Sequence, residues 1–300
     1  MNKAPEFRKI LIYGVGLIGG SFALALKSAG AAGEIVGFGR RPASLLKALE
    51  LGLIDRAGIN PAHELEDTDL VLVAAPVGQM PGIFAQIAPY LGPHTVVTDG
   101  GSTKTDVVKA ARAAFGGKIG QFVPAHPIAG AENSGVAASR SDLYQGRKVV
   151  VTTLPENSDE RLDRVKRAWA LCGAEICELT PEQHDRVFAA VSHLPHLLAF
   201  ALVRDLAERP DAPLFFDFAA SGFRDFTRIA ASHPEMWRDI CLANRAALLK
   251  EIETYQNQLR EFRTALEQND GAALEKRFAV ARKARREWGE KQEFRERTGE

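Results

Sequence analysis

Apolar and polar residues follow two different patterns along this chain. In the first part, short apolar runs alternate with amphipathic stretches. The apolar runs predict buried strands at residues 9–13, 34–38, 69–74, 95–99, 122–124, 148–152 and 174–179. The stretches between them predict helices at residues 18–29, 43–51, 104–115 and 160–171. Strands that alternate with helices indicate an α/β fold with a parallel, doubly wound sheet, as in a Rossmann domain.

The pattern changes at Thr180 and Pro181. Threonine is a favourable N-cap and proline suits the first turn of a helix, so a new helix is expected to begin there. Beyond this point the periodicity predicts only helices, at residues 187–206, 234–263 and 272–288. We therefore expect a Rossmann domain over residues 1–179 and an all-helical domain over residues 180–300.

Composition narrows the classes of protein to consider. Basic and acidic residues balance at 38 each in 300 residues, which argues against a protein built to coat nucleic acid. Three cysteines without a C-x-x-C pair make a disulfide framework or a cysteine-rich metal site unexpected. The N-terminus lacks the pattern of a signal peptide, and the apolar stretch 187–203 holds two histidines and a proline. We expect a cytoplasmic protein with no membrane span, in which this stretch is a buried helix.

A glycine-rich turn follows the first predicted strand. Gly14, Gly16 and Gly19 form a G-x-G-x-x-G motif, with Leu17 and Ile18 between the last two. A lone match is weak, but a match between a strand and a helix is typical of dinucleotide sites. The glycines would allow the tight turn, the approach of the pyrophosphate and close helix packing. The alternative is a strand–helix turn without a ligand.

The end of the second strand bears on which cofactor is bound. Enzymes that use NAD usually place an acidic residue there for the ribose 2′-hydroxyl. This chain instead has Gly39, Arg40 and Arg41. Arginine can form charge-assisted hydrogen bonds with a 2′-phosphate, so the sequence favours NADP, with NAD also accepted. The alternative is that both arginines are ordinary solvated residues.

Other polar residues follow strand ends, where α/β sheets bind ligands. Pro76 follows the third strand, and Ser102 follows the fourth, where it could also be a helix cap. His126 follows the fifth and is well placed for a general base, although a lone histidine is often structural.

The helical part adds His193 and His196, three residues apart on one helix face, and Arg224 in an apolar segment. The histidines lack further ligands for a metal, so we predict no metal site and expect substrate hydrogen bonds or core packing. Arg224 suits a carboxylate, or an ion pair with Asp225.

Five segments share one order with a known family. They are GVGLIGGS, TDGGSTK, HPIAGAENSG, AVSHLPH and GFRDFTRIA, and they span most of the chain. In this order they resemble the prephenate/arogenate dehydrogenases of tyrosine biosynthesis. The resemblance implies a homodimer whose active site lies between the Rossmann and helical domains. It implies oxidative decarboxylation of prephenate or arogenate, with hydride transfer to NADP or NAD.

The resemblance also implies roles for individual residues. His126 would accept the proton of the substrate hydroxyl, and Ser102 would align it. Arg224 would bind a substrate carboxylate. The remaining substrate-site residues implied are His193, His196 and Glu132.

Two other functions compete with this one. A β-hydroxyacid dehydrogenase has a similar domain order but is expected to use a lysine base on a helix, and residues 187–206 contain no lysine. A non-catalytic module that senses the nicotinamide state would need no His126. It would leave the histidines and the arginine of the helical part unexplained.

Overall fold

A parallel sheet of six strands forms the centre of the first part of the chain in the computed structural model, which describes residues 4–130 and 135–298. Its strands are β1 (Phe7–Tyr13), β2 (Ala32–Phe38), β3 (Arg56–Ala57), β4 (Leu70–Val73), β5 (Val96–Asp99) and β6 (Phe122–Val123). Their order is β3-β2-β1-β4-β5-β6, and every neighbouring pair is parallel. From β1 the strands are added first on one side (β2 and β3) and then on the other side (β4, β5 and β6). This strand order confirms the predicted Rossmann fold.

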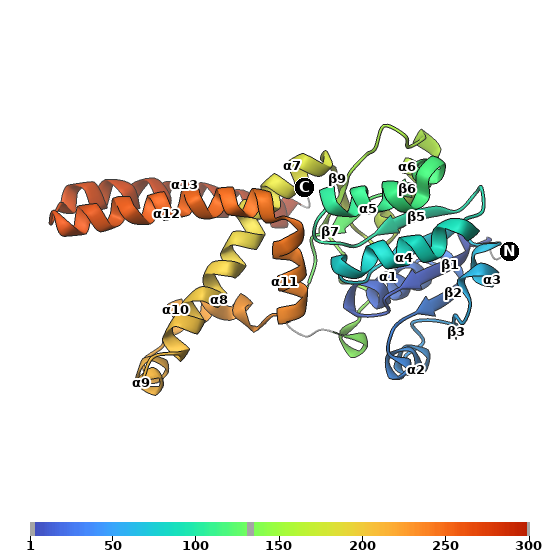
Figure 1. The fold of residues 1–300 in the computed structure, drawn as a ribbon, viewed down its shortest axis with the longest axis horizontal. Coiled ribbons are helices and arrows are strands. Elements are labelled where there is room, and N and C mark those ends of the chain that lie inside the picture. Colours follow the sequence, from blue (N-terminus) through green and yellow to red (C-terminus); the bar gives the residue numbers. More distant parts are fainter. Residues whose placement is uncertain (1–3, 131–134, 299–300) are drawn as a thin grey trace. The chain divides into compact units, whose positions relative to one another are not determined.

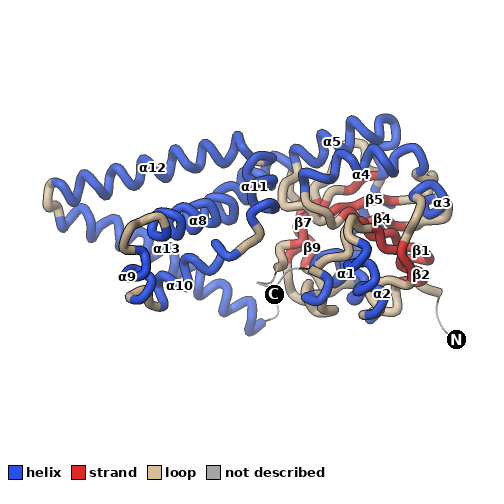
Figure 2. Tube along the Cα trace, turned by 60° about the horizontal axis from the view of Figure 1, so that its bottom comes forward, coloured by secondary structure: helices blue, strands red, loops and turns tan. Residues whose placement is uncertain are grey.

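Alternate side chains of the central strands enter two separate cores. Ile10 and Ile12 of β1 pack with α1 (Leu17–Ser28) and α6 (Asp159–Leu171) on one face. Leu11 and Tyr13 pack with α4 (Met80–Ile87) and α5 (Thr105–Phe115) on the other face. Strands buried on both faces read as continuous apolar runs, which is why the sequence pattern found them. Figure 1 shows the helices packed around the strands, and in Figure 2 α4 and α5 lie on one side of the strands and α1 on the other.

A second sheet corrects the prediction of one mainly parallel sheet. It contains β7 (Ala125–Pro127), β8 (Lys148–Val151) and β9 (Glu175–Glu178). β7 is antiparallel to β8, and β8 is parallel to β9. Pro124 separates β6 from β7, and a proline interrupts a ladder because it has no N–H to donate. His126 therefore lies within β7 and belongs to the second sheet.

The helical part begins as predicted. Helix α7 (Pro181–Phe188) starts with a capping box: the Thr180 hydroxyl accepts from the Gln183 N–H, and the Gln183 side chain accepts from the Thr180 N–H. A π-helical turn, η5 (Ala189–His193), joins α7 to α8 (Leu194–Ala207). Figure 2 shows that the elements after α7 are helices and loops. The other helices are α2 (Pro42–Glu50), α3 (Pro61–Leu65), α9 (Ala212–Asp217), α10 (Ser221–Thr227), α11 (Pro234–Ala243), α12 (Arg245–Glu267) and α13 (Gly271–Thr298).

One long predicted helix is two helices in the structure. The periodicity predicts a single helix over residues 234–263, but α11 ends at Ala243, with Asn244 as its C-cap, and α12 starts at Arg245. The chain forms two compact units, the first ending at Ala247 and the second starting at Leu248. In the second unit α12 and α13 form a helical hairpin in which Phe262 stacks on Phe278.

The apolar segment of the helical part is less buried than predicted. The continuous helix Pro181–Ala207 is long and apolar enough to span a membrane, and only 28% of its most apolar window is buried. The expectation of a buried helix is therefore wrong for most of this segment. Length and composition alone are weak grounds for a span, because helices of soluble proteins also meet them. Its buried positions include His184, Asp185 and His193, which face the site described next.

Candidate active site

The glycine turn has the form that a dinucleotide phosphate needs. Gly14 has a φ of +95°, and a Cβ there would lie 2.6 Å from the Ala74 carbonyl oxygen. A Cβ on Gly19 would collide with the Gly14 carbonyl oxygen, so both positions require glycine. Gly16 instead faces open space, and it is the N-cap of α1 with no side chain bonded to the first N–H groups. Those groups and the positive end of the helix can therefore hold a pyrophosphate.

A cavity of about 600 Å³ opens in front of this turn. Predicted site residues that line it are Gly14, Gly16, Ile18, Arg40, Arg41, Pro76 and Ser102. Leu17 and Gly19 do not line it; they belong to the first turn of the helix behind the cradle. Side chains of α11 and the residue before it also line the cavity, namely His233, Glu235, Met236 and Ile240. Sequence patterns contain no signal for these, because α11 reads as an ordinary amphipathic helix.

The two arginines lie at one end of this cavity, beside Ser44 at the start of α2. Both are exposed, and within the described residues neither has an ion-pair partner. The Phe38 ring lies beside them and stacks on Tyr13, with ring centroids 4.6 Å apart. Two unpaired guanidinium groups at this end suit an anionic ligand group.

His126 is the first member of a buried chain of hydrogen bonds. Its Nδ1 lies 2.8 Å from Nε2 of His184, and Nδ1 of His184 lies 2.8 Å from Oδ1 of Asp185. The Asp185 carboxylate also accepts the N–H groups of Lys104 and Thr105, each at 2.8 Å. Helix α7 thus brings His184 and Asp185 onto the strand that carries His126.

The charges in this chain decide where the protons lie. Burial acts to raise the pKa of Asp185, but hydrogen bonds from His184, Thr105 and Lys104 outweigh it and hold the pKa below its ordinary value. An ionised Asp185 accepts a hydrogen bond from the Nδ1–H of His184, so Nε2 of a neutral His184 accepts a hydrogen bond from the Nδ1–H of His126. This leaves Nε2 of His126 with a free lone pair, as a general base requires.

The electrostatic surroundings keep both imidazoles neutral. Burial is the largest cause that lowers the pKa of His126 well below its ordinary value, and the charges of His184, Lys104 and His193 add to it. Burial also lowers the pKa of His184, although Asp185 opposes the shift. Sequence patterns mark His126 but not His184 or Asp185, which lie 58 and 59 residues further along the chain.

The two histidines of the helical part pack against Trp237 of α11. His196 stacks on the indole, with ring centroids 3.7 Å apart, and its Nδ1 lies 2.8 Å from the Ser192 carbonyl oxygen. His193 contacts the indole edge, and its Nδ1 lies 3.1 Å from Nδ2 of Asn244. Burial lowers the pKa of His193 to about 4. No group of three or more residues able to hold a metal occurs among the described residues.

The predicted carboxylate arginine is mostly exposed to solvent. Arg224 of α10 is 79% exposed in its side chain and lies 3.6 Å from Asp225. Arg228, one turn further on, is close enough for its charge to lower the pKa of His196, where burial is the larger cause. Glu132, also predicted for the site, is outside the described residues.

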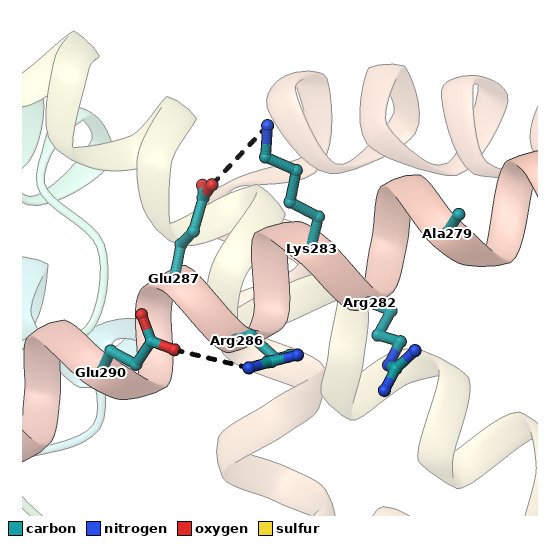
Figure 3. Close-up of a pocket in the computed structure, with 6 residues that line it drawn as sticks. All are labelled: Ala279, Arg282, Lys283, Arg286, Glu287 and Glu290. Carbon is teal, nitrogen blue, oxygen red and sulfur yellow. Dashed lines mark ion pairs between the residues drawn. The ribbon is translucent and has the colours of Figure 1, made fainter.

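A second hollow, of about 320 Å³, lies on α13 in the other compact unit (Figure 3). It is lined by Ala279, Arg282, Lys283, Arg286, Glu287 and Glu290. The ion pairs Lys283–Glu287 and Arg286–Glu290 join residues four apart on the same helix, at 3.9 and 4.0 Å. Such pairs are typical of a solvated helix face, and the hollow has no buried polar group among its described lining residues that would bind a ligand.

Comparisons with known proteins agree over nearly the whole chain. Residues 22–178 match the family described as prephenate dehydrogenase, nucleotide-binding domain, and residues 180–280 match prephenate dehydrogenase, dimerization domain. The chain is 35% identical to prephenate dehydrogenase of Bacillus subtilis, over 94% of this chain and 76% of that protein. It is 33% identical to cyclohexadienyl dehydrogenase of Zymomonas mobilis, over 93% of this chain and 95% of that one.

A solved structure agrees with the fold as well. Prephenate dehydrogenase from A. aeolicus, in complex with hydroxyphenyl propionate and NAD+, is 38% identical with a TM-score of 0.86. The match covers 95% of this chain and 99% of that one. With both family domains matched and relatives above 30% identity over most of their length, the chain belongs to the prephenate dehydrogenase family.

Proposed function

We propose that this protein oxidises and decarboxylates prephenate, arogenate or both, with hydride transfer to a nicotinamide cofactor. Prephenate gives 4-hydroxyphenylpyruvate and arogenate gives tyrosine. The observation that carries this proposal is the hydrogen-bonded chain His126–His184–Asp185. Membership of the family, and relatives that are prephenate and cyclohexadienyl dehydrogenases, support it.

The reaction requires the protein to accept one proton from the substrate. Nε2 of His126 accepts the proton of the ring hydroxyl as the carbon that bears it becomes a carbonyl carbon. The bond to the ring carboxylate then breaks, carbon dioxide leaves, and the bonding electrons move through the ring to the carbonyl oxygen. The phenolate formed in this way takes the proton back from His126 and becomes a phenol. When bound, the nicotinamide supplies the acceptor for the hydride from the hydroxyl-bearing carbon. Aromatisation favours the products, so the side chains mainly position the groups.

Several side chains are proposed to hold the substrate. Ser102 lines the cavity and aligns the hydroxyl with His126. His193 and His196 form the substrate face of the helical part, with Trp237 behind them. Arg224 keeps its proposed role as a partner of a substrate carboxylate, and Glu132, which is outside the described residues, keeps its proposed place at the substrate site. We add Arg228 as a carboxylate partner, because its charge reaches His196.

For the cofactor, we propose a preference for NADP, with NAD also accepted. The support is that Arg40, Arg41 and Ser44 line the cavity and that no acidic residue directly follows the end of β2. A relative of 38% identity is known in complex with NAD+, so the preference concerns the 2′-phosphate and not the chemistry. Replacing both arginines by alanine should raise the KM for NADP by about tenfold to a hundredfold and leave the KM for NAD nearly unchanged. Equal changes for both cofactors would contradict the preference.

We also propose a homodimer in the cytoplasm, with the functional division at residues 1–179 and 180–300. The matched dimerization domain supports the dimer. So does the exposed apolar surface around α9, where Leu214, Phe216 and Phe218 are 55%, 40% and 81% exposed. A patch of this kind on a soluble protein commonly marks an interface. Sedimentation of the purified chain would test the dimer.

The decisive test of the activity is cofactor reduction, followed by absorbance, with prephenate and arogenate each paired with NADP+ and NAD+. Turnover in at least one pairing is the expected result. The best pairing identifies both the substrate and the cofactor. No turnover in all four pairings, by a protein that is folded and binds the cofactor, would contradict the proposed function.

A further inference from the structure

Behind the histidine chain lies a buried ion pair that the reaction above does not use. Asp99 is the last residue of β5, and Lys104 is the residue before α5. Both side chains are fully buried, and the Lys104 ammonium contacts Oδ2 of Asp99 directly. Lysine and aspartate are rarely buried completely, and a buried pair is seldom worth its desolvation in stability alone. The Asp99–Lys104 pair is therefore expected to have a role beyond folding.

The pair is connected to His126 from two directions. Oδ1 of Asp99 accepts the N–H of Ala125 at 3.0 Å, and Ala125 directly precedes His126 in β7. The backbone N–H of Lys104 donates to Oδ1 of Asp185, the atom that also contacts His184. One short segment, β5 and the start of α5, thus fixes both the strand that carries the base and the carboxylate at the end of its hydrogen-bond chain.

Charge forms a third connection. The groups that face His126 are His184 and Asp185 from α7, His193 from η5, and Asp99 and Lys104 from β5 and the start of α5. Among the described residues the Lys104 ammonium is the one cation that acts on His126 and on His184, and it disfavours a second positive charge on either ring.

We propose that the Asp99–Lys104 pair is a positioning element for His126: it anchors the strand that carries the base, and its ammonium keeps the imidazole unprotonated until it receives the substrate's proton. This inference rests on the proposed function for its importance in turnover, but not for its effect on the protonation of His126. Because His126 stays neutral at acidic pH, it can act as a base there, and activity extends to lower pH. Once His126 has taken up the substrate's proton, the neighbouring cation favours release of that proton.

The test replaces the pair by neutral side chains. A single Lys104→Met change would leave a buried, unpaired carboxylate and could unfold the protein. The double variants Asp99→Asn with Lys104→Met, and Asp99→Asn with Lys104→Gln, remove both charges. In both, the amide oxygen introduced at position 99 can still accept the Ala125 N–H. Lys104→Arg is the matched control, because it keeps the cation beside Asp99.

Two readouts are measured on the full chain. The first is the titration of His126, followed by NMR of histidine-labelled protein and assigned with His126→Asn. It needs neither substrate nor cofactor. The second is the acid limb of kcat/KM. In both neutral pairs the titration and the acid limb should move to higher pH by on the order of one unit, and in Lys104→Arg both should stay near the wild-type position.

Each outcome decides the proposal. If the titration of His126 does not move in the folded double variants, Asp99 and Lys104 are structural residues and the proposal is overturned. An equal shift of the titration in Lys104→Arg would overturn it as well. Loss of folding in both neutral pairs would also overturn it, because the pair would then act on stability. Absence of turnover in the wild type, with His126 titration moved as expected, would contradict the proposed function and leave this inference standing.

Discussion

Asp185→Asn tests the proposed proton arrangement most directly, because it changes one atom and one charge. The carboxylate accepts three hydrogen bonds, from the Lys104 N–H, the Thr105 N–H and the His184 ring, all at 2.8 Å. An asparagine can keep its oxygen at the Oδ1 position and serve two of these donors. Its NH2 group then faces the Thr105 N–H, and one buried donor is left without an acceptor. We expect a loss in the free energy of unfolding of about 1–3 kcal/mol.

The effect on turnover follows from the loss of charge. A neutral amide accepts from His184 less strongly than a carboxylate does, by about 1–1.5 kcal/mol. His184 can then carry its proton on Nε2 and donate to Nδ1 of His126, which forces the proton of His126 onto the nitrogen that should act as the base. We expect kcat to fall by about tenfold to a thousandfold. The lower bound follows from the weakened hydrogen bond, because about 1.4 kcal/mol corresponds to a tenfold change in rate. The upper bound does not exceed the whole contribution of a general base to the rate.

The assay is steady-state turnover with the substrate and cofactor pair that the wild type prefers, with cofactor affinity measured separately. Glu182→Gln is the matched control, because Glu182 lies on the same helix but is exposed. It should change the free energy of unfolding by no more than about 0.5 kcal/mol, and kcat by no more than the factor that corresponds to this energy. A folded Asp185→Asn protein with wild-type kcat would refute the arrangement, and His126 would have to be oriented by other groups.

Three further predictions concern the base, the substrate arginines and the pH dependence of stability. His126→Asn should lower kcat by about 10²–10⁴ with cofactor affinity nearly unchanged, and an unchanged kcat in a stopped-flow or steady-state assay would remove the general base. Arg228→Ala should raise the substrate KM more than Arg224→Ala does, because the charge of Arg228 acts on His196 whereas Arg224 lies 3.6 Å from Asp225; the reverse order would return the carboxylate role to Arg224. The free energy of unfolding should fall as pH drops below about 6.5, because the unfolded chain then takes up protons that the folded chain refuses. His193, with a folded pKa of about 4, alone accounts for roughly 3 kcal/mol by the time the pH reaches that value. Denaturant titrations at several pH values would measure this, and stability constant between pH 7 and 5 would contradict it.

The features that sequence patterns predicted well are those that local structure determines. The glycine cradle needs only a strand, a tight turn and a helix in succession, and Gly14 and Gly19 are excluded from having side chains by backbone atoms close by. The start of α7 is likewise local, since Thr180 and Gln183 satisfy each other's backbone groups. Both features could be found because the interacting atoms lie within a few residues of one another.

The partners of His126 could not be found in this way. His184 and Asp185 lie within the first turns of a helix, where polar residues are ordinary, and the sequence does not say which strand the helix will contact. The same holds for α11, whose residues line the cavity. The one available signal was Asn244, a poor helix former in the middle of the predicted helix 234–263. Its position marks the break that the periodicity overlooked.

Two irregularities of the helical part meet at His193. The π-helical turn Ala189–His193 ends at this histidine, and such turns are frequent at functional sites. The break after α11 places Asn244 so that its Nδ2 donates to the Asp185 carbonyl oxygen at 2.7 Å and lies 3.1 Å from Nδ1 of His193. A regular helix at either place would be favoured by local hydrogen bonding alone. Asn244 is 5% exposed and joins His193, which we propose faces the substrate, to Asp185 of the histidine chain. The two departures together would therefore connect the proposed substrate side of the site to its proton-transfer side.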